Sequence, residues 1–140
     1  MPEDNIISLI ANAARMYRTN LNNLFVRNHI DLTSEMYVVM RELWKKDGKR
    51  LWEIAEVLNK DKGAITKVVD NLEKRKLLTR VTDAGDKRNK QLLLTIDGAK
   101  LKVKVMPLVE ELYNHTIATI SEHKLEQSKQ VLNILIGRLS

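Results

Sequence analysis

The feature that most constrains this chain is a pair of short amphipathic segments, joined by a tight link at 59–61 and followed at once by a hairpin. A short extended entry precedes the first segment, 51–58, in which apolar residues recur at helical spacing. Asp61 is a typical N-cap for the second segment, 62–76, whose apolar residues follow an i, i+3, i+4, i+7 pattern. The apolar positions are Ile54, Ala55 and Leu58 in the first segment, and Ile65, Val68, Val69 and Leu72 in the second. The pattern predicts two helices that share a core, in the order of a helix-turn-helix.

The hairpin that follows has a long and mostly charged tip. The strand-like runs LLTRVTD (77–83) and KQLLLTI (90–96) flank the polar stretch DAGDKRNK (83–90). A tight turn needs fewer residues than this stretch contains. A solvated loop is one interpretation of the tip, and a contact surface is the other. A basic-tipped hairpin directly after a helix-turn-helix is typical of a winged helix.

Longer helical patterns lie on both sides of this central part. Thr33 is a good N-cap for a helix that ends before Gly48, and Thr95 and Ser121 are expected to cap two later helices. Pro107 is expected to kink the first of these two without ending it, because helical spacing resumes beyond it.

These segments predict a fold that is mainly α with a small β-hairpin wing. We expect one domain over residues 1–140, with a winged helix-turn-helix lobe at about 32–98. N- and C-terminal dimerisation helices are expected on either side, at about 4–28 and 96–139.

The net charge of +6 is unevenly distributed. The segment 41–104 carries +8 and the two ends together carry −2, which favours a polyanion as the partner of the middle of the chain. The 140 residues contain no cysteine, which excludes disulfides, thiolate metal sites and a thiol redox switch. No apolar stretch approaches the roughly 20 residues of a membrane span, and the acidic start is unlike a signal peptide. We therefore expect a soluble, cytoplasmic protein without a membrane partner.

Three blocks of this sequence resemble the multiple antibiotic resistance regulator (MarR) family. The blocks are LTSEMYVVMRELWK, LWEIAEVLNKDKGAITKVVDNLEKRKLLTRV and DAGDKRNKQLLLTIDGAK, within residues 32–100. The most diagnostic part is the pattern D-x-x-D-x-R at 83–88, followed by an apolar strand and Gly98. The sequence departs from the family pattern at Lys76, where the family often has glycine. The resemblance implies a dimeric winged-helix transcriptional regulator, usually a repressor.

The outward face of the second central helix has residues that suit DNA. A helix fits the major groove of B-DNA, and side chains on its first turns reach base edges or phosphates. The small residues Gly63 and Ala64 would also let backbone N–H groups approach a phosphate. An ordinary solvated helix face is the rival interpretation for any single residue. The predicted DNA contacts on this helix are Lys62, Gly63, Thr66, Lys67 and Asn71.

The tip of the wing has the second set of predicted DNA contacts. We expect Arg88 to enter the minor groove, where the negative potential is concentrated, and Lys87, Asn89 and Lys90 to contact phosphates. Asp86 would orient the Arg88 guanidinium through a bidentate ion pair, a pairing that the family resemblance also implies. In a merely solvated turn the same pair would contribute little.

The outer helices predict a symmetric homodimer. Leu125, Leu132 and Leu139 follow a seven-residue spacing, and the outer helices carry more apolar surface than so small a domain buries internally. Packing within one chain is the alternative. A dimer would present two recognition helices to a pseudo-palindromic operator.

The sequence favours a DNA-binding regulator over an enzyme. His29, His115 and His123 are scattered, and no catalytic or metal-binding motif appears, so we expect no cofactor and no metal. The predicted function is a sequence-specific transcriptional regulator, a homodimeric repressor that binds double-stranded DNA. The alternatives are a protein-interaction module that docks an acidic partner and an architectural DNA binder without sequence preference.

The family resemblance further implies a pocket for a small-molecule effector between the dimerisation helices and the DNA-binding lobe. Flexible methionines and amphipathic aromatic residues suit an apolar or aromatic ligand, and a nearby arginine would attract an acid. Core packing is the alternative for each apolar residue, because all lie at helical spacing. The residues expected at the pocket are Arg15, Met16, Tyr17, Met36, Tyr37 and Met40.

Overall fold

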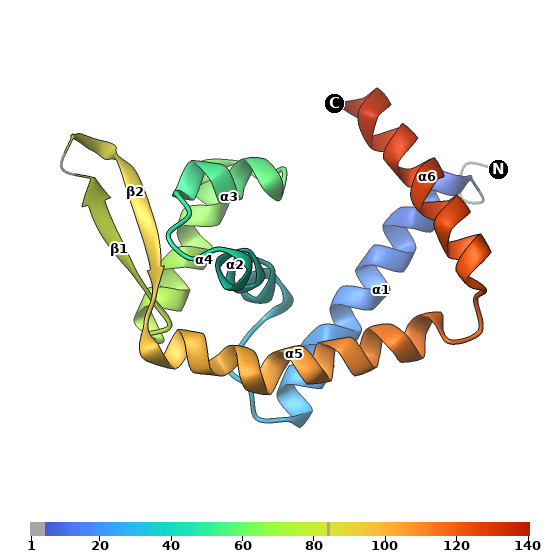
Figure 1. Cartoon of the computed structure of the whole chain (residues 1–140), viewed down its shortest axis with the longest axis horizontal. Coiled ribbons are helices and arrows are strands. Elements are labelled where there is room, and N and C mark those ends of the chain that lie inside the picture. Colours follow the sequence, from blue (N-terminus) through green and yellow to red (C-terminus); the bar gives the residue numbers. More distant parts are fainter. Residues whose placement is uncertain (1–4, 84) are drawn as a thin grey trace. The chain divides into compact units, whose positions relative to one another are not determined.

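The computed structural model describes residues 5–83 and 85–140, and for residues 83 and 86–89 it describes the backbone alone. Within these residues, six helices and a two-stranded antiparallel sheet follow one another along the chain (Figure 1). They are α1 (Ile6–Arg27), α2 (Ser34–Lys45), α3 (Leu51–Val57), α4 (Lys62–Lys74), β1 (Leu78–Asp83), β2 (Asp86–Leu94), α5 (Ile96–Ile117) and α6 (Glu122–Leu139). The predicted class, mainly α with a small β-hairpin, is confirmed.

The helices begin at the N-caps that the sequence predicts. At each of these caps a side-chain oxygen accepts a hydrogen bond from the backbone N–H three residues later, one of the groups that a helix leaves unpaired at its start. The donor–acceptor distances are 3.2 Å at Thr33, 2.7 Å at Asp61, 3.0 Å at Thr95 and 3.2 Å at Ser121. Pro107 lies inside α5, which continues to Ile117 as expected.

Three helices end in a left-handed residue that is not glycine. His29, Asn59 and Lys76 have φ values of 56°, 51° and 59°. At each end, the residue that follows donates its N–H to a carbonyl five residues back, which is the hydrogen bond of a Schellman motif. These bonds are Ile30 to Phe25, Lys60 to Ala55 and Leu77 to Leu72, at 2.9, 2.9 and 3.1 Å. The φ of Lys76 lies in the region that glycine adopts at no steric cost, which agrees with the glycine expected at this position from the family resemblance.

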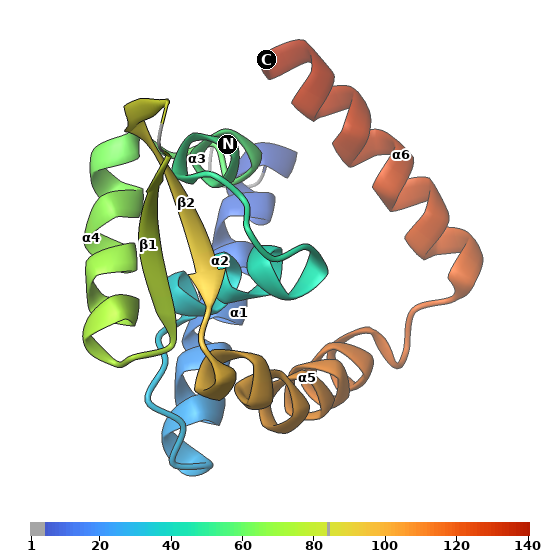
Figure 2. The same cartoon turned by 60° about the vertical axis from the view of Figure 1, so that its left-hand side comes forward.

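The chain divides into two compact units, residues 1–108 and 109–140. In the first unit, α2, α3, α4 and the hairpin enclose one apolar core, and α4 runs alongside β1 (Figure 2). α1 contacts α2, where the rings of Phe25 and Tyr37 lie 5.8 Å apart. The buried indole of Trp44 donates to the carbonyl of Gly98 at 2.9 Å, which fixes the start of α5. Fully buried core side chains include Val39, Met40, Leu43, Ile54, Ile65, Val69, Leu72, Leu78 and Leu92.

The hairpin differs from the sequence prediction in one respect. Pairing runs from Leu78–Leu94 to Asp83–Asp86, with an irregularity between Thr82 and Asp83. The prediction that the second strand begins at residue 90 is therefore wrong, since β2 already begins at Asp86. A polar composition does not prevent the backbone of a two-stranded ribbon from pairing, so most of the charged tip is strand.

The second unit contains the end of α5 and all of α6. No residue of α6 is buried, although the helix contains several large apolar side chains. Those that are exposed are Val131, Leu132, Ile134, Ile136 and Leu139.

Candidate nucleic-acid interface

The outer face of α4 combines the residues that the sequence predicts to contact DNA. The inner face buries Ile65, Val69 and Leu72, which fixes the rotation of the helix about its axis. The opposite face is solvent-accessible: Lys62, Gly63, Lys67 and Asn71 are exposed, and Thr66 is half-buried. The hydroxyl of Thr66 donates to the carbonyl of Lys62 at 2.7 Å, so its oxygen is left as an acceptor.

The first turn of α4 explains the glycine at position 63. A Cβ atom there would lie 3.2 Å from Oδ1 of Asp61, the atom that accepts the N–H of Ala64. A side chain at this position would therefore crowd the N-cap. Glycine keeps the cap intact and keeps the first turn open to a phosphate.

The predicted contact residues at the tip of the wing lie on β2. Lys90 is exposed and pairs with Thr82 of β1. The backbone of residues 86–89 belongs to β2. The side chains of Asp86, Lys87, Arg88 and Asn89 lie outside the described part of the structure, so the Asp86–Arg88 ion pair and the minor-groove contact stay predictions.

The loop before α3 fixes the base of β2. Arg50 forms an isolated bridge with Gln91, and the N–H of Leu92 donates to the carbonyl of Lys49 at 2.9 Å. The side-chain amide of Gln91 donates to the carbonyl of Gly48, also at 2.9 Å. The short extended entry predicted before α3 is confirmed. It pairs with β2 through this single bridge, on the edge of the two-stranded sheet.

A second set of contacts fixes β1 to α4, and it centres on Arg80. Nη2 of Arg80 lies 2.6 Å from Oδ1 of Asp70 and 2.8 Å from Oε1 of Glu73. The backbone N–H of Arg80 donates to Oε2 of Glu73 at 3.2 Å. The hydrogen bond that the Arg80 guanidinium donates to Glu73 raises the pKa of Arg80, and the same bond lowers the pKa of Glu73. We refer to Arg80, Asp70 and Glu73 as the Arg80 clamp.

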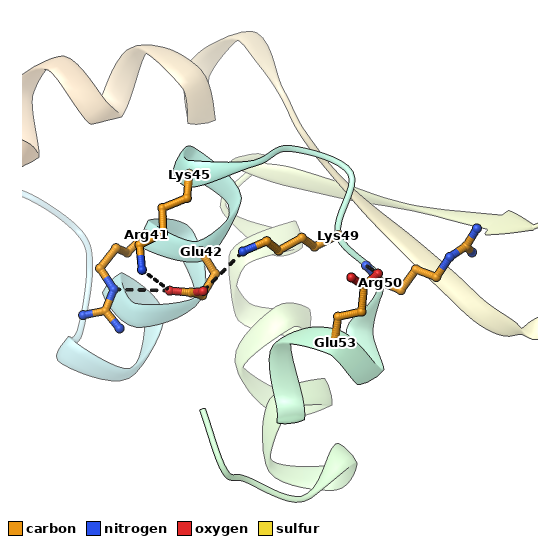
Figure 3. Close-up of polar contacts among 6 residues, drawn as sticks. All are labelled: Arg41, Glu42, Lys45, Lys49, Arg50 and Glu53. Atoms are coloured by element: carbon orange, nitrogen blue, oxygen red, sulfur yellow. Dashed lines mark hydrogen bonds and ion pairs between the residues drawn. The ribbon is translucent and has the colours of Figure 1, made fainter. Parts of the chain in front are cut away.

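A buried carboxylate connects α2 to the loop that supports β2 (Figure 3). The side chain of Glu42 is only 3% exposed, and it lies 3.1 Å from Nζ of Lys45, 3.3 Å from Nζ of Lys49 and 3.5 Å from Nε of Arg41. Burial would raise the pKa of Glu42, but the hydrogen bonds from Lys45 and Lys49 outweigh it and hold the pKa below its usual value. The carboxylate is therefore ionised at neutral pH and anchors Lys49 beneath the sheet.

The residues expected at an effector pocket fall into two groups. Met36, Tyr37 and Met40 are buried in the first unit, whereas Arg15 and Met16 on α1 are exposed and Tyr17 is half-buried. A pocket of about 250 Å³ lies elsewhere, lined by Asp31, Arg75, Leu77 and Leu101. None of the six expected residues lines this pocket, and their role in effector binding stays a prediction.

The Arg80 clamp and Glu42 are the parts of the interface that the sequence did not reveal. Asp70 and Glu73 are spaced i, i+3 on α4, and Arg80 follows seven residues after Glu73. This spacing predicts the contact only when it is already known that the hairpin packs against α4. Exposed Trp52, in the first turn of α3, was also not predicted to contact DNA. The first helix of a helix-turn-helix crosses the phosphate backbone, which makes Trp52 a further candidate contact.

Two negative findings concern the described residues. Across 5–83 and 85–140, apart from the undescribed side chains of residues 83 and 86–89, no three histidine, aspartate or glutamate side chains form a group that could hold a metal ion. Over the same ranges, no helix has the length and apolarity needed to cross a membrane.

Comparison with known proteins identifies transcriptional regulators that are similar to this chain. The sequence model of the MarR family matches residues 32–90, which include α4, β1 and the tip of the hairpin. The transcriptional regulator HosA of Escherichia coli is 28% identical over 107 residues, covering 76% of this chain and 79% of HosA. The organic hydroperoxide resistance transcriptional regulator of Bacillus subtilis is 28% identical over 106 residues, covering 76% of this chain and 69% of that protein. The S. aureus MepR–DNA complex has a similar structure, with a TM-score of 0.88 and 25% identity, over 97% of this chain and 99% of MepR.

Proposed function

Because the chain belongs to the MarR family of winged-helix, DNA-binding transcriptional regulators, we propose that it is a repressor that binds a pseudo-palindromic operator as a homodimer. The observation that carries the proposal is the exposed basic face of α4 beside a hairpin with exposed Lys90. The similarity to MepR, which has been solved in complex with DNA, supports this use of the face. α4 would enter the major groove, and the wing would lie over the adjacent minor groove.

Selection of bound fragments from genomic DNA, followed by fluorescence anisotropy, tests the proposal. The selected operator should bind about a thousandfold more tightly than a random duplex at the same salt concentration. Lys67→Ala should weaken operator binding, whereas Lys129→Ala removes the same charge from an exposed position of α6 and should not. Equal affinity for both duplexes would identify an architectural DNA binder. Absence of DNA binding would leave the alternative of a module that docks an acidic protein.

The homodimer is supported by the apolar surface of α6. Leu132 and Leu139 are 37% and 79% exposed, and no α6 residue is buried. Large apolar surfaces on small soluble domains usually mark an interface. Sedimentation at micromolar concentration should give a dimer, and Leu132→Glu with Leu139→Glu should give a monomer with weakened operator binding. Gln130→Glu, at an exposed position of the same helix, is the matched control and should leave the dimer intact. A double variant that remains a dimer would remove α6 from the interface.

The finer part of the proposal is release of DNA by a small apolar or aromatic molecule. The chain has no cysteine, so oxidation of a thiol cannot be the signal. A ligand that releases operator must bind more weakly to the operator-bound form. Calorimetric titration of a panel of aromatic acids, with and without operator, tests this requirement. A lower affinity in the presence of operator supports release, and an Arg15→Ala variant should weaken acids more than neutral analogues. Equal affinities in both titrations would contradict it.

A further inference from the structure

We propose that Arg80 is a positioning residue that determines sequence specificity at the wing. By joining β1 to Asp70 and Glu73 of α4, it sets the angle between the wing and the recognition helix, so that both grooves are read in one register. The inference rests on the proposed operator recognition and deepens it. It assigns to Arg80 an effect on bases that its own side chain does not contact.

The geometry of the clamp constrains the strand as well as the side chain. Glu73 accepts hydrogen bonds from both the guanidinium and the backbone N–H of Arg80, at 2.8 and 3.2 Å. If only the long arginine side chain contacted α4, the main chain of β1 could still shift relative to the helix. The backbone contact removes that freedom, because it fixes the main chain of β1 against the last turns of α4. Arg80 is only 21% exposed, whereas Asp70 and Glu73 are 44% and 39% exposed, so the ion pairs are partly open to solvent and the backbone contact adds to them.

Because Arg80 lies near the base of the hairpin, a small rotation of β1 at this residue moves the tip by a larger distance. Arg80 pairs with Leu92, near the base of the hairpin, and the strand continues for three more residues to Asp83. Three residues of strand extend about 10 Å. A rotation of about 10° at the base therefore moves the tip by roughly 2 Å, a third of the roughly 6 Å width of the minor groove. A small loosening at Arg80 is enough to misplace a side chain at the tip.

The charges of the clamp allow the positioning effect to be separated from simple electrostatics. Asp70 and Glu73 are 44% and 39% exposed carboxylates on a helix that faces a polyanion. Arg80→Gln makes the region more negative by one charge. Asp70→Asn with Glu73→Gln makes it more positive by two. The two variants change the charge in opposite directions, and both remove the ion pairs of Arg80 with Asp70 and Glu73.

The experiment measures discrimination between bases for both variants. Two operator pairs are compared, one with A·T replaced by G·C beneath the wing and one with a base changed in the major groove opposite α4. The full-length protein should discriminate each pair by about fivefold or more. Both variants should lose discrimination beneath the wing, to about twofold or less, and keep it in the major groove. Arg75→Gln is the matched control, because it removes one positive charge and an ion pair with Asp31, which is not a hairpin residue, and it should change neither.

The outcomes separate the two accounts. If charge alone matters, the double variant binds more tightly with unchanged discrimination beneath the wing, and the inference is overturned. Unchanged discrimination in Arg80→Gln overturns it as well.

A measurement without DNA distinguishes failure of the clamp from failure of operator recognition. Since the chain has no cysteine, nitroxide labels on Lys74→Cys and Thr82→Cys attach only to exposed positions of α4 and β1. The label–label distance distribution should broaden in both clamp variants. If the unaltered protein does not discriminate either operator pair, the proposed operator recognition fails, and an unchanged distribution would then also refute positioning by Arg80.

Discussion

Replacing Glu42 by glutamine is the most direct test of the electrostatics beneath the sheet. Glu42 is 3% exposed and accepts hydrogen bonds from Lys45 and Lys49, whose side chains are 61% and 17% exposed. A hydrogen bond to a charged group contributes about 1.5 to 3 kcal/mol. Lys45 regains water when its partner is neutralised, so most of the loss comes from Lys49. We expect the free energy of unfolding to fall by about 2 kcal/mol, and the melting temperature by about 4 to 8 °C.

The pH dependence gives the refuting result. The pKa of Glu42 is lowered in the folded protein, so its stabilisation is fully present above the unfolded pKa of about 4.3 and is lost as pH falls through the lower folded pKa. In urea unfolding, the difference between the unaltered protein and Glu42→Gln should be full at pH 7 and shrink below about pH 4. Glu56→Gln, at an exposed position of α3, is the control and should change stability by less than about 0.5 kcal/mol. A difference that is absent at pH 7, or equal at pH 7 and pH 3, would refute the ion-pair account.

Three further predictions follow from backbone geometry and from the wing. Lys76→Gly should raise the free energy of unfolding by about 1 kcal/mol, since φ at this position is 59°; a loss of stability in urea would contradict this. Gly98→Ala should lower it by about 2 kcal/mol or more, because the new Cβ would lie 2.0 Å from the carbonyl oxygen of Leu77; an unchanged melting curve would be inconsistent with that contact. Arg88→Ala should weaken operator binding by about 1 to 3 kcal/mol with no change in melting temperature, and anisotropy together with calorimetry checks both parts.

Much of the fold could be predicted from local signals. Thr33, Asp61, Thr95 and Ser121 each act within three residues of themselves, so their caps are visible in the sequence and are confirmed in the structure. The inward face of α4 was equally visible, because burial of Ile65, Val69 and Leu72 follows directly from helical periodicity. The start of β2 was missed for the converse reason. Charged residues carry no pattern that distinguishes a solvated strand from a solvated loop.

The site could be predicted only where its chemistry is local to one helix face. The outward residues of α4 were identified because the buried face determines which residues face away. The Arg80 clamp and the contacts of Glu42 were missed, because each joins elements whose proximity depends on the tertiary fold. Lys49 reaches Glu42 across seven residues that include the end of α2 and the loop. No periodicity in the sequence specifies such a contact.

The two sides of the wing are fixed by different interactions, and this difference predicts how salt acts on operator binding. Gln91 and Leu92 of β2 donate to uncharged backbone carbonyls, whereas β1 depends on the partly exposed ion pairs of Arg80. Salt screens exposed ion pairs strongly and affects neutral hydrogen bonds little.

Counterion release from the basic contacts of a dimer gives a log–log slope of about −5 to −9 for operator affinity against salt concentration. The contacts counted, per subunit, are Lys62, Lys67, Lys87, Arg88 and Lys90. Weakening of the clamp should add to this slope, because salt then loosens the wing as well as displacing the protein from phosphate. The variant Asp70→Asn with Glu73→Gln has no clamp to screen, so its slope should be shallower than that of the unaltered protein. Anisotropy titrations from 50 to about 300 mM salt measure both slopes. An unchanged slope in the variant would mean that salt acts on the phosphate contacts alone, and a steeper slope would contradict the prediction outright.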